Sequence, residues 1–305
     1  CRLMAGTTTE LTTDHSRASA DAAHSHGLTP ASAEGAAVAG ASRANRFASF
    51  DVADFAPVSG SEEEWRFSPV DRLARLFDTT AAAGHIPVEV TAADGVQVQA
   101  LARTGATTPS IAGVPNDRLS ATAWYAAPET VVVTVPAELE VQGETVVAIR
   151  GTGIDGVSGG ATSAHVQLIA EHHSKALVVI DHTGLAEIAQ TVEIDVRDGA
   201  NLTVVSIQDW DRGTVHGSSH RARLGADATL KHIVVSLGGD VVRVTVDGEF
   251  TAPGSSLESL GLYYADAGQH LEHRLFVDHA VPRCTSRVTY KGALQGADAR
   301  SVWVG

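Results

Sequence analysis

Alternating apolar and polar residues dominate the chain beyond Ile86. Residues 192–196, Val-Glu-Ile-Asp-Val, put their apolar side chains on one face and their carboxylates on the other, and residues 197–199 then read as a turn. This period of two predicts strands with one buried face. Further strands are predicted, with no helical pattern between them, at 131–135, 145–149, 166–169, 177–180, 241–246, 257–264, 271–277 and 287–290.

The longest alternating run extends from Ala222 to Val234. Small apolar residues alternate there with charged residues and threonine, so the run predicts one long strand whose inward side chains suit a narrow interior. His232 falls on the apolar face of this run. We therefore interpret it as a hydrogen-bonded core residue.

A short helix is predicted just before this β-rich region. Val70, Leu73, Leu76 and Phe77 are spaced by three and four residues and form one apolar stripe. Ser68 precedes them as the predicted N-cap, with proline at the first helical position and Gly84 as a stop.

Glycine-centred turns recur along the β region, at 198–200, 224–226, 253–255 and 295–297. Their intervals match one coil of a solenoid or simple multiples of it. Short strands with few aromatic residues also fit a β-sandwich, and periodicity alone leaves that alternative open. The repeat favours a β-solenoid, in which each coil stacks on the previous one.

Composition narrows the range of functions. The chain has 305 residues, 44% of them apolar, and a formal net charge of −14, which disfavours nucleic acids and anionic membranes as partners. Its apolar runs are too short to cross a bilayer. The two cysteines, Cys1 and Cys284, cannot form a disulfide framework, so a reducing cytoplasm is the expected compartment.

The sequence also predicts how the chain is divided. Residues 1–42 are expected to be a disordered tail because they contain almost no large apolar side chain. Residues 43–85 are expected to form a small amino-terminal helical region, and residues 86–305 a β-helix core. Cys1 at the start and an uncapped strand at 301–305 read as the ends of a fragment, with Met4 as a candidate start; a mature lipoprotein is the alternative.

Two glycine motifs resemble functional loops but lack the required context. Residues 151–156 match G-x-G-x-x-G, and residues 156–160 match G-x-S-x-G. Nucleotide binding and a nucleophile elbow both need a helix that starts at the glycines, and none is predicted there. We interpret both as loops. No phosphate-binding G-x-x-x-x-G-K-[ST] motif occurs.

Several histidines are weak candidates for metal ligands. On a strand His216 and His220 share a face, whereas the adjacent His172 and His173 point in opposite directions. Other candidates are Glu171 with His182, the pair His270 and His273, and the tail residues His15, His24 and His26. None has a spacing specific to a metal site, so no metal site and no catalytic residue are assigned.

Taken together, several segments resemble the SufD family of iron–sulfur cluster assembly proteins in its actinobacterial form. The resemblance covers the chain from Arg43 onward. It lies in the order of the segments 43–47, 63–69, 220–228, 236–240 with Arg243, 261–264, 269–271, 278–279, then Pro282, Cys284, Ser286 and 290–294.

The resemblance implies a mainly β fold, a right-handed parallel β-helix (β-solenoid) with a small amino-terminal helical region. It implies a non-catalytic scaffold subunit of the SUF complex that pairs with a SufB homologue and the SufC ATPase. A transient iron–sulfur cluster would be built at the level of the complex, and ATP would be bound by SufC. Whether flavin takes part is left open.

The family resemblance assigns few site residues here. The family's carboxy-terminal coils and helical domain, with the histidine that faces the cluster, lie beyond Gly305. Cys284 is a weak candidate for cluster binding, and Asp278, His279, Cys284 and Lys291 are structural or interface candidates. Two alternatives remain. One is a β-helical carbohydrate-active enzyme such as a lyase, which predicts an external groove with clustered carboxylates, calcium and a basic catalytic residue. The other is a metalloenzyme that uses the paired histidines.

Overall fold

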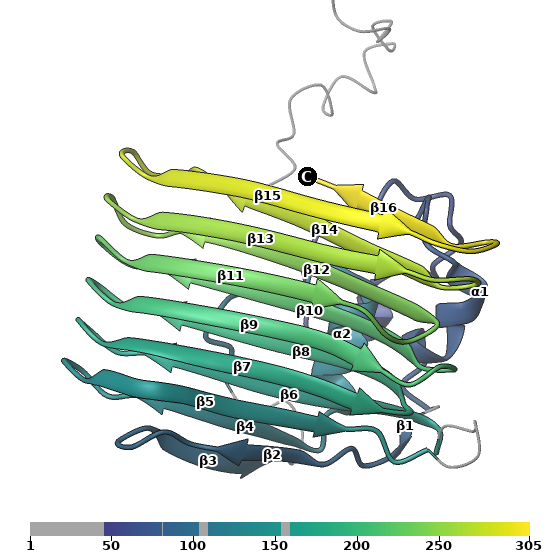
Figure 1. The fold of residues 1–305 in the computed structure, drawn as a ribbon, viewed down its shortest axis with the longest axis horizontal. Coiled ribbons are helices and arrows are strands. Elements are labelled where there is room, and N and C mark those ends of the chain that lie inside the picture. Colours follow the sequence, from purple (N-terminus) through teal and green to yellow (C-terminus); the bar gives the residue numbers. More distant parts are fainter. Residues whose placement is uncertain (1–45, 81, 104–108, 154–158) are drawn as a thin grey trace, which may run out of the picture. The chain divides into compact units, whose positions relative to one another are not determined.

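Two parallel β-sheets stacked face to face make up most of the chain (Figure 1). The computed structural model describes residues 46–80, 82–103, 109–153 and 159–305, and Arg46–Gly305 form one unit. The expected tail, 1–42, lies outside these residues, as do residues 154–158 of the two glycine motifs. Strands alternate between the sheets along the chain, so that each coil contributes one strand to each sheet. The predicted β-solenoid is therefore confirmed.

Both sheets are built almost entirely from parallel neighbours. In sheet A the neighbouring coil strands are β4 (Glu129–Val135), β6 (Ala161–Ala170), β8 (Glu187–Val196), β10 (Val215–Leu224), β12 (Val241–Phe250), β14 (His270–Asp278) and β16 (Arg300–Val304). In sheet B they are β5 (Glu140–Arg150), β7 (Lys175–Gly184), β9 (Asn201–Trp210), β11 (Thr229–Ser236), β13 (Ser256–Ala265) and β15 (Thr285–Leu294). In-register partners differ by about one coil; Leu202, for example, pairs with Leu230, which pairs with Leu257.

Antiparallel strands close the amino-terminal end of the stack. The strand β2 (Val88–Thr91) runs antiparallel to β5, and β3 (Gln97–Ala102) runs antiparallel to β4. A further short strand, β1 (Ala82–Gly84), runs parallel to β6. The reversal of direction ends the stacking of parallel coils at this end.

Turns that lead from sheet A to sheet B form a hydrogen-bonded column. In each turn one residue has left-handed backbone geometry, with φ between 53° and 88°: Glu138, His173, Gly199, Asp227, Gly254 and Arg283. The amides of the first four donate to the next coil, as from Gly199 N to Ala226 O at 2.8 Å and from Asp227 N to Pro253 O at 3.1 Å. The turns thus hold adjacent coils in register.

The column corrects two predictions. The run from Ala222 to Val234 is not one strand, because a turn at 225–228 separates β10 from β11. His172 and His173 lie in the turn at 171–174, not on a strand with opposite orientations. The other predicted strands all fall within observed ones.

Helices cover the outer face of sheet A. The predicted helix is a short one, α1 (Val70–Leu73), followed by a 3-10 helix (Ala74–Phe77). The prediction that Ser68 is the N-cap of this helix is wrong, because Pro69 takes that position. The Ser68 hydroxyl instead donates to Glu272 at 2.7 Å. A second helix, α2 (Arg118–Ala126), was not predicted and begins with a capping box between Asp117 and Ser120. None of the described helices is long and apolar enough to span a membrane.

Candidate functional site

The end of β14 and the turn that follows it hold three of the four predicted interface candidates. Asp278 ends β14, and His279 and Cys284 lie at the two ends of the turn. The Cys284 thiol is half-buried and donates to Ala252 O at 3.4 Å. His279 Nε2 lies 2.9 Å from the Ser286 hydroxyl, and its ring packs on Phe250. This turn therefore brings a thiol and an imidazole into one corner of the solenoid.

Lys291 lies apart from this corner. It is an exposed residue on β15 whose register partner on β13 is Leu262. By strand alternation its side chain is on the outer face of sheet B, since the half-buried Tyr290 next to it packs against the core. The four candidates thus do not form one site.

Polar side chains fill part of the solenoid interior, where β-solenoids usually place apolar ones. We call these residues the interior polar column: His182, Gln190, Ser206, Gln208, Trp210, His216, Ser218, Ser236 and His273. Each is at most 3% exposed. His182, Gln208 and Ser236 are register neighbours on β7, β9 and β11, so polar groups follow one another from coil to coil.

Hydrogen bonds connect the column across the two sheets. Gln190 Oε1 lies 2.9 Å from the Nε2 atoms of both His182 and His216. Ser236 donates to Gln208 at 2.8 Å and lies 2.8 Å from His273 Nε2. Burial of these polar groups is tolerated because their bonding capacity is largely used inside the fold.

Burial also sets the protonation of the interior histidines. Desolvation lowers the pKa of His273 to about 4, helped by the charge of His232. It lowers the pKa of His182 and places that of His216 well below its ordinary value. The interior imidazoles are thus neutral near pH 7, and neutral imidazole is the form that accepts hydrogen bonds and binds metals.

His216 and His220 share the inward face of β10, as predicted, but they bond to different partners. His220 Nδ1 lies 3.0 Å from His232 Nε2, and desolvation lowers the pKa of His232 to about 4. His270 and His273 lie on opposite faces of β14: His270 faces Glu272 at 3.3 Å, and His273 faces the interior. Among the described residues, no three His, Cys, Asp or Glu side chains are arranged to hold a metal ion.

A layer of charged side chains lies between sheet A and the segments that cover it. Arg243 is 1% exposed and lies 3.2 Å from Glu272, with its guanidinium stacked on the Trp65 ring at 3.8 Å. The Glu193 carboxylate lies 3.0 Å from His165 Nε2. Burial alone raises the pKa of Glu193, but the hydrogen bond and charge of His165, with the charge of Arg221, lower it to about 2. This layer fastens the amino-terminal segments to the sheet.

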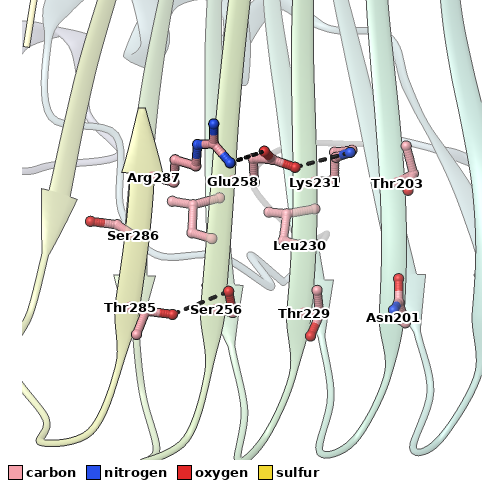
Figure 2. Close-up of a pocket in the computed structure, with 11 residues that line it drawn as sticks. Asn201, Thr203, Thr229, Leu230, Lys231, Ser256, Glu258, Thr285, Ser286 and Arg287 are labelled. Carbon is pink, nitrogen blue, oxygen red and sulfur yellow. Dashed lines mark hydrogen bonds and ion pairs between the residues drawn. The ribbon is translucent and has the colours of Figure 1, made fainter. Parts of the chain in front are cut away.

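An open groove of about 410 Å³ crosses the outer face of sheet B (Figure 2). Its lining is mainly hydroxyl and amide side chains, with one carboxylate, Glu258. Figure 2 shows Glu258 between Lys231, at 2.9 Å, and Arg287, at 3.9 Å. Because Glu258 is the one carboxylate in this lining, the groove lacks the carboxylate cluster that the lyase alternative predicts, and a carboxylate flanked by two cations is a poor calcium ligand.

Sequence reasoning missed both buried networks. The sequence indicates that His216 and His220 share a face and that His232 is a core residue, but the partners of His216 and His220 are supplied by other strands. The charged layer gave no signal because its members alternate with apolar residues, as solvent-exposed residues would. A count of charged residues on the face opposite the predicted core, strand by strand, is the signal that could have indicated a cover over sheet A.

Comparison with known proteins agrees with this architecture. The family described as "SUF system FeS cluster assembly, SufBD core domain" matches residues 153–305. A SufBD family iron–sulfur cluster assembly protein of Mycobacterium leprae (strain TN) is 44% identical over 279 residues, which are 89% of this chain and 70% of the relative. A second, of Mycobacterium tuberculosis (strain ATCC 25618 / H37Rv), is 45% identical over 266 residues, which are 85% of this chain and 66% of the relative. The chain therefore belongs to the SufBD family of iron–sulfur cluster assembly proteins.

Proposed function

We propose that this chain is a SufD-type scaffold subunit of the SUF machinery in the cytoplasm. It pairs with a SufB homologue and with the SufC ATPase, which binds the ATP. It has no catalytic residues of its own and contributes surfaces to a complex in which an iron–sulfur cluster is built transiently. The proposal extends the family membership, which rests on 44% and 45% identity to SufBD proteins.

The observation that carries the proposal is the interlocking of two SufD-like segments. Residues 261–264 lie on β13 and residues 290–294 on β15, with Gly261 beside Tyr290 and Tyr263 beside Gly292 in the register. The Tyr290 ring occupies the space where a side chain on Gly261 would lie, and the Tyr263 ring does the same at Gly292. Glycine and tyrosine therefore have to occur together in both segments, which gives the resemblance a structural basis.

Co-expression tests the proposal directly. The complete reading frame, carrying an affinity tag, is produced with the SufB and SufC homologues of the same organism, and the captured material is analysed by native mass spectrometry. Stoichiometric recovery of both proteins is expected. Capture of this chain alone would contradict the proposal and would return attention to the groove in Figure 2 and a polysaccharide screen.

A second measurement addresses the corner at β14 and β15. In the captured complex, Cys284→Ala and His279→Ala are compared with Thr229→Ala, an outer-face residue of β11. If the thiol contributes to cluster binding, iron and acid-labile sulfide per complex fall for Cys284→Ala while subunit recovery is unchanged. Equal iron and sulfide in all three variants would assign Cys284 a packing role.

A further inference from the structure

An open pocket of about 270 Å³ lies within the segments that cover sheet A, and we call it the cover pocket. Its lining comes from within residues 46–65 and from residues 116–118 at the start of α2. One water molecule takes up about 30 Å³ in the liquid, so the pocket has room for about nine waters or for one ligand of roughly ten non-hydrogen atoms. It therefore suits a small molecule.

Aromatic and aliphatic side chains form the apolar part of the lining. Phe47 is 61% exposed, and its ring meets that of Phe55 edge-on at a centroid distance of 5.2 Å. Val58 and the buried Trp65 complete this part. An apolar ligand group that covers Phe47 would remove an exposed ring from water, which is favourable. The pocket thus has a place for an apolar substituent.

Five charged side chains also line the pocket: Arg46, Glu62, Glu64, Asp117 and Arg118. Three of them have close partners in the fold. Glu62 accepts hydrogen bonds from the backbone amides two and three residues before it, at 2.8 and 3.1 Å. Asp117 caps α2 and lies 3.7 Å from Arg243, and Arg46 donates to Asp247. These three groups are therefore already committed to the structure.

The other two, Glu64 and Arg118, each keep one end free. Glu64 Oε1 lies 3.5 Å from Arg46 Nη1, whereas its Oε2 has no partner among the described residues. Arg118 donates from Nε and Nη1 to three backbone carbonyls. A guanidinium has five N–H groups, so the two on Nη2 have no partner in the described part of the chain. The pocket thus offers one free carboxylate oxygen and one free guanidinium nitrogen.

The environment of Glu64 favours a further cation. Burial raises the pKa of Glu64, and the nearby charge of Asp117 adds to this effect. The contact with Arg46 acts in the opposite direction but does not fully compensate. A positive group held at Oε2 would therefore be bound with gain.

The two free ends together select the ligand. A carboxylate binds an ammonium group, and a guanidinium binds a carboxylate, in charge-assisted hydrogen bonds. A simple cation would leave Arg118 unused, and a simple anion would leave Glu64 unused. A molecule with both groups and an apolar substituent uses every part of the lining. Since an α-amino acid core has five non-hydrogen atoms, about four or five remain for its side chain in a pocket of this size.

We propose that the cover pocket binds a free α-amino acid with an aliphatic side chain of about the size of leucine. Its ammonium group contacts Glu64, its carboxylate contacts Arg118, and its side chain covers Phe47. Because the pocket joins residues 46–65 to the start of α2, the bound ligand would also stabilise the cover of sheet A. The inference goes beyond the scaffold role proposed above and does not depend on it.

Leucine and three analogues serve as probes. The analogue 4-methylpentanoate lacks the ammonium group, 3-methylbutylamine lacks the carboxylate, and glycine lacks the side chain. Binding to the full chain is measured by NMR titration of the Trp65 indole N–H, since this residue lines the pocket. We expect a dissociation constant of about 0.1 to 1 mM for leucine. Each analogue should bind about tenfold more weakly or worse, because each loses one of the three contacts.

Variants make the test specific. Glu64→Gln should weaken the binding of leucine about tenfold and leave that of 4-methylpentanoate unchanged, because this analogue has no group for Glu64. Phe47→Ala should weaken the binding of leucine about threefold or more. The controls Glu89→Gln and Phe67→Ala change exposed residues outside the pocket and should have no effect. Arg118 also holds three backbone carbonyls, so its contribution is measured through 3-methylbutylamine and not by substitution.

Three results would overturn the proposal. The first is the absence of a saturable shift with leucine up to its solubility limit. The second is equal affinity for leucine and either 3-methylbutylamine or 4-methylpentanoate, which would assign the pocket to simple cations or simple anions. The third is an equal effect of Glu64→Gln on leucine and on 4-methylpentanoate. Circular dichroism and melting temperature confirm that each variant is folded. None of these measurements involves SufB or SufC, so failure here is distinguishable from failure of the proposed function.

Discussion

Trp210 donates its indole N–H to Nδ1 of His216 across 3.1 Å inside the solenoid. An indole nitrogen can only donate, so Nδ1 of His216 must be unprotonated. A neutral His216 therefore carries its proton on Nε2, which lies 2.9 Å from Gln190 Oε1. One tryptophan thus fixes the tautomer of a buried histidine.

The tautomer can be measured directly. Nitrogen-15 chemical shifts of the imidazole at pH 7 should identify His216 as the Nε2–H form. In Trp210→Phe the donor is lost, and the Nδ1–H form should become populated. Detection of Nδ1–H in the unaltered chain would contradict the assignment.

Acid should destabilise the fold through the interior histidines. Because burial lowers the pKa of His232 to about 4, the unfolded chain binds more protons than the folded chain between about pH 6.5 and 4, and stability falls as the pH decreases through this window. For His232 alone we expect a loss of about 2 kcal/mol in the free energy of unfolding between pH 7 and 5. Urea titrations at several pH values measure it.

The matched variants isolate this contribution. His232→Gln should remove about 2 kcal/mol of the pH-dependent loss, since glutamine does not titrate. Thr229→Ala changes an outer-face residue of β11 that does not titrate and should leave the pH dependence as it is. If both variants retain the full pH dependence, His232 is not the responsible group.

The buried ion pair of Arg243 and Glu272 should be costly to break. Arg243→Met leaves the carboxylates of Glu272 and Asp117, both buried, without this cation, at a cost of about 3 to 5 kcal/mol. The control is Arg223→Met, which removes a partly exposed pair with Glu249 at 3.7 Å and should cost under about 1 kcal/mol. Urea unfolding followed by tryptophan fluorescence gives both values. Similar costs would show that the buried pair contributes no more than the exposed one.

The turn column predicts a difference between two glycines with the same backbone geometry. Gly254 has φ 88° and Gly143 has φ 86°, so alanine at either should cost about 1 to 2 kcal/mol. At Gly254 the new methyl group would also meet the Asp227 carboxylate of the adjacent turn, whereas nothing lies within 4 Å at Gly143. Gly254→Ala should therefore lower the melting temperature more than Gly143→Ala. Equal shifts would mean that contact between turns adds nothing.

Strand positions could be predicted because one face of every strand is buried. The break between β10 and β11 could not, since the alternation stays in phase across the turn: Leu224 is buried before it, and Ala228 and Leu230 are buried after it. The period of two therefore continues through residues that are not extended. The left-handed residues of the turns could also be predicted only in part from the glycines, because Asp227 occupies the position that glycine has in the neighbouring turns.

The site was less predictable than the fold. His216 and His220 could be placed on one face, but Gln190 and His232, which they bond, come from other strands, and no local pattern identifies such partners. The helix α2 was missed because its capping box uses Ser120 where glutamate or glutamine is the usual signal. The SufBD family could be identified because it depends on the order of many short segments.

Stacking of near-equivalent coils has a consequence for how such a chain can change over evolutionary time. Among the described residues, each strand from β7 to β13 pairs only with the coil before it and the coil after it. Gain or loss of one whole coil would preserve the inward and outward sides of every remaining strand, whereas a single-residue insertion within a strand would exchange them. Length variation in this lineage should therefore occur in steps of about one coil, and smaller insertions should concentrate in the turns.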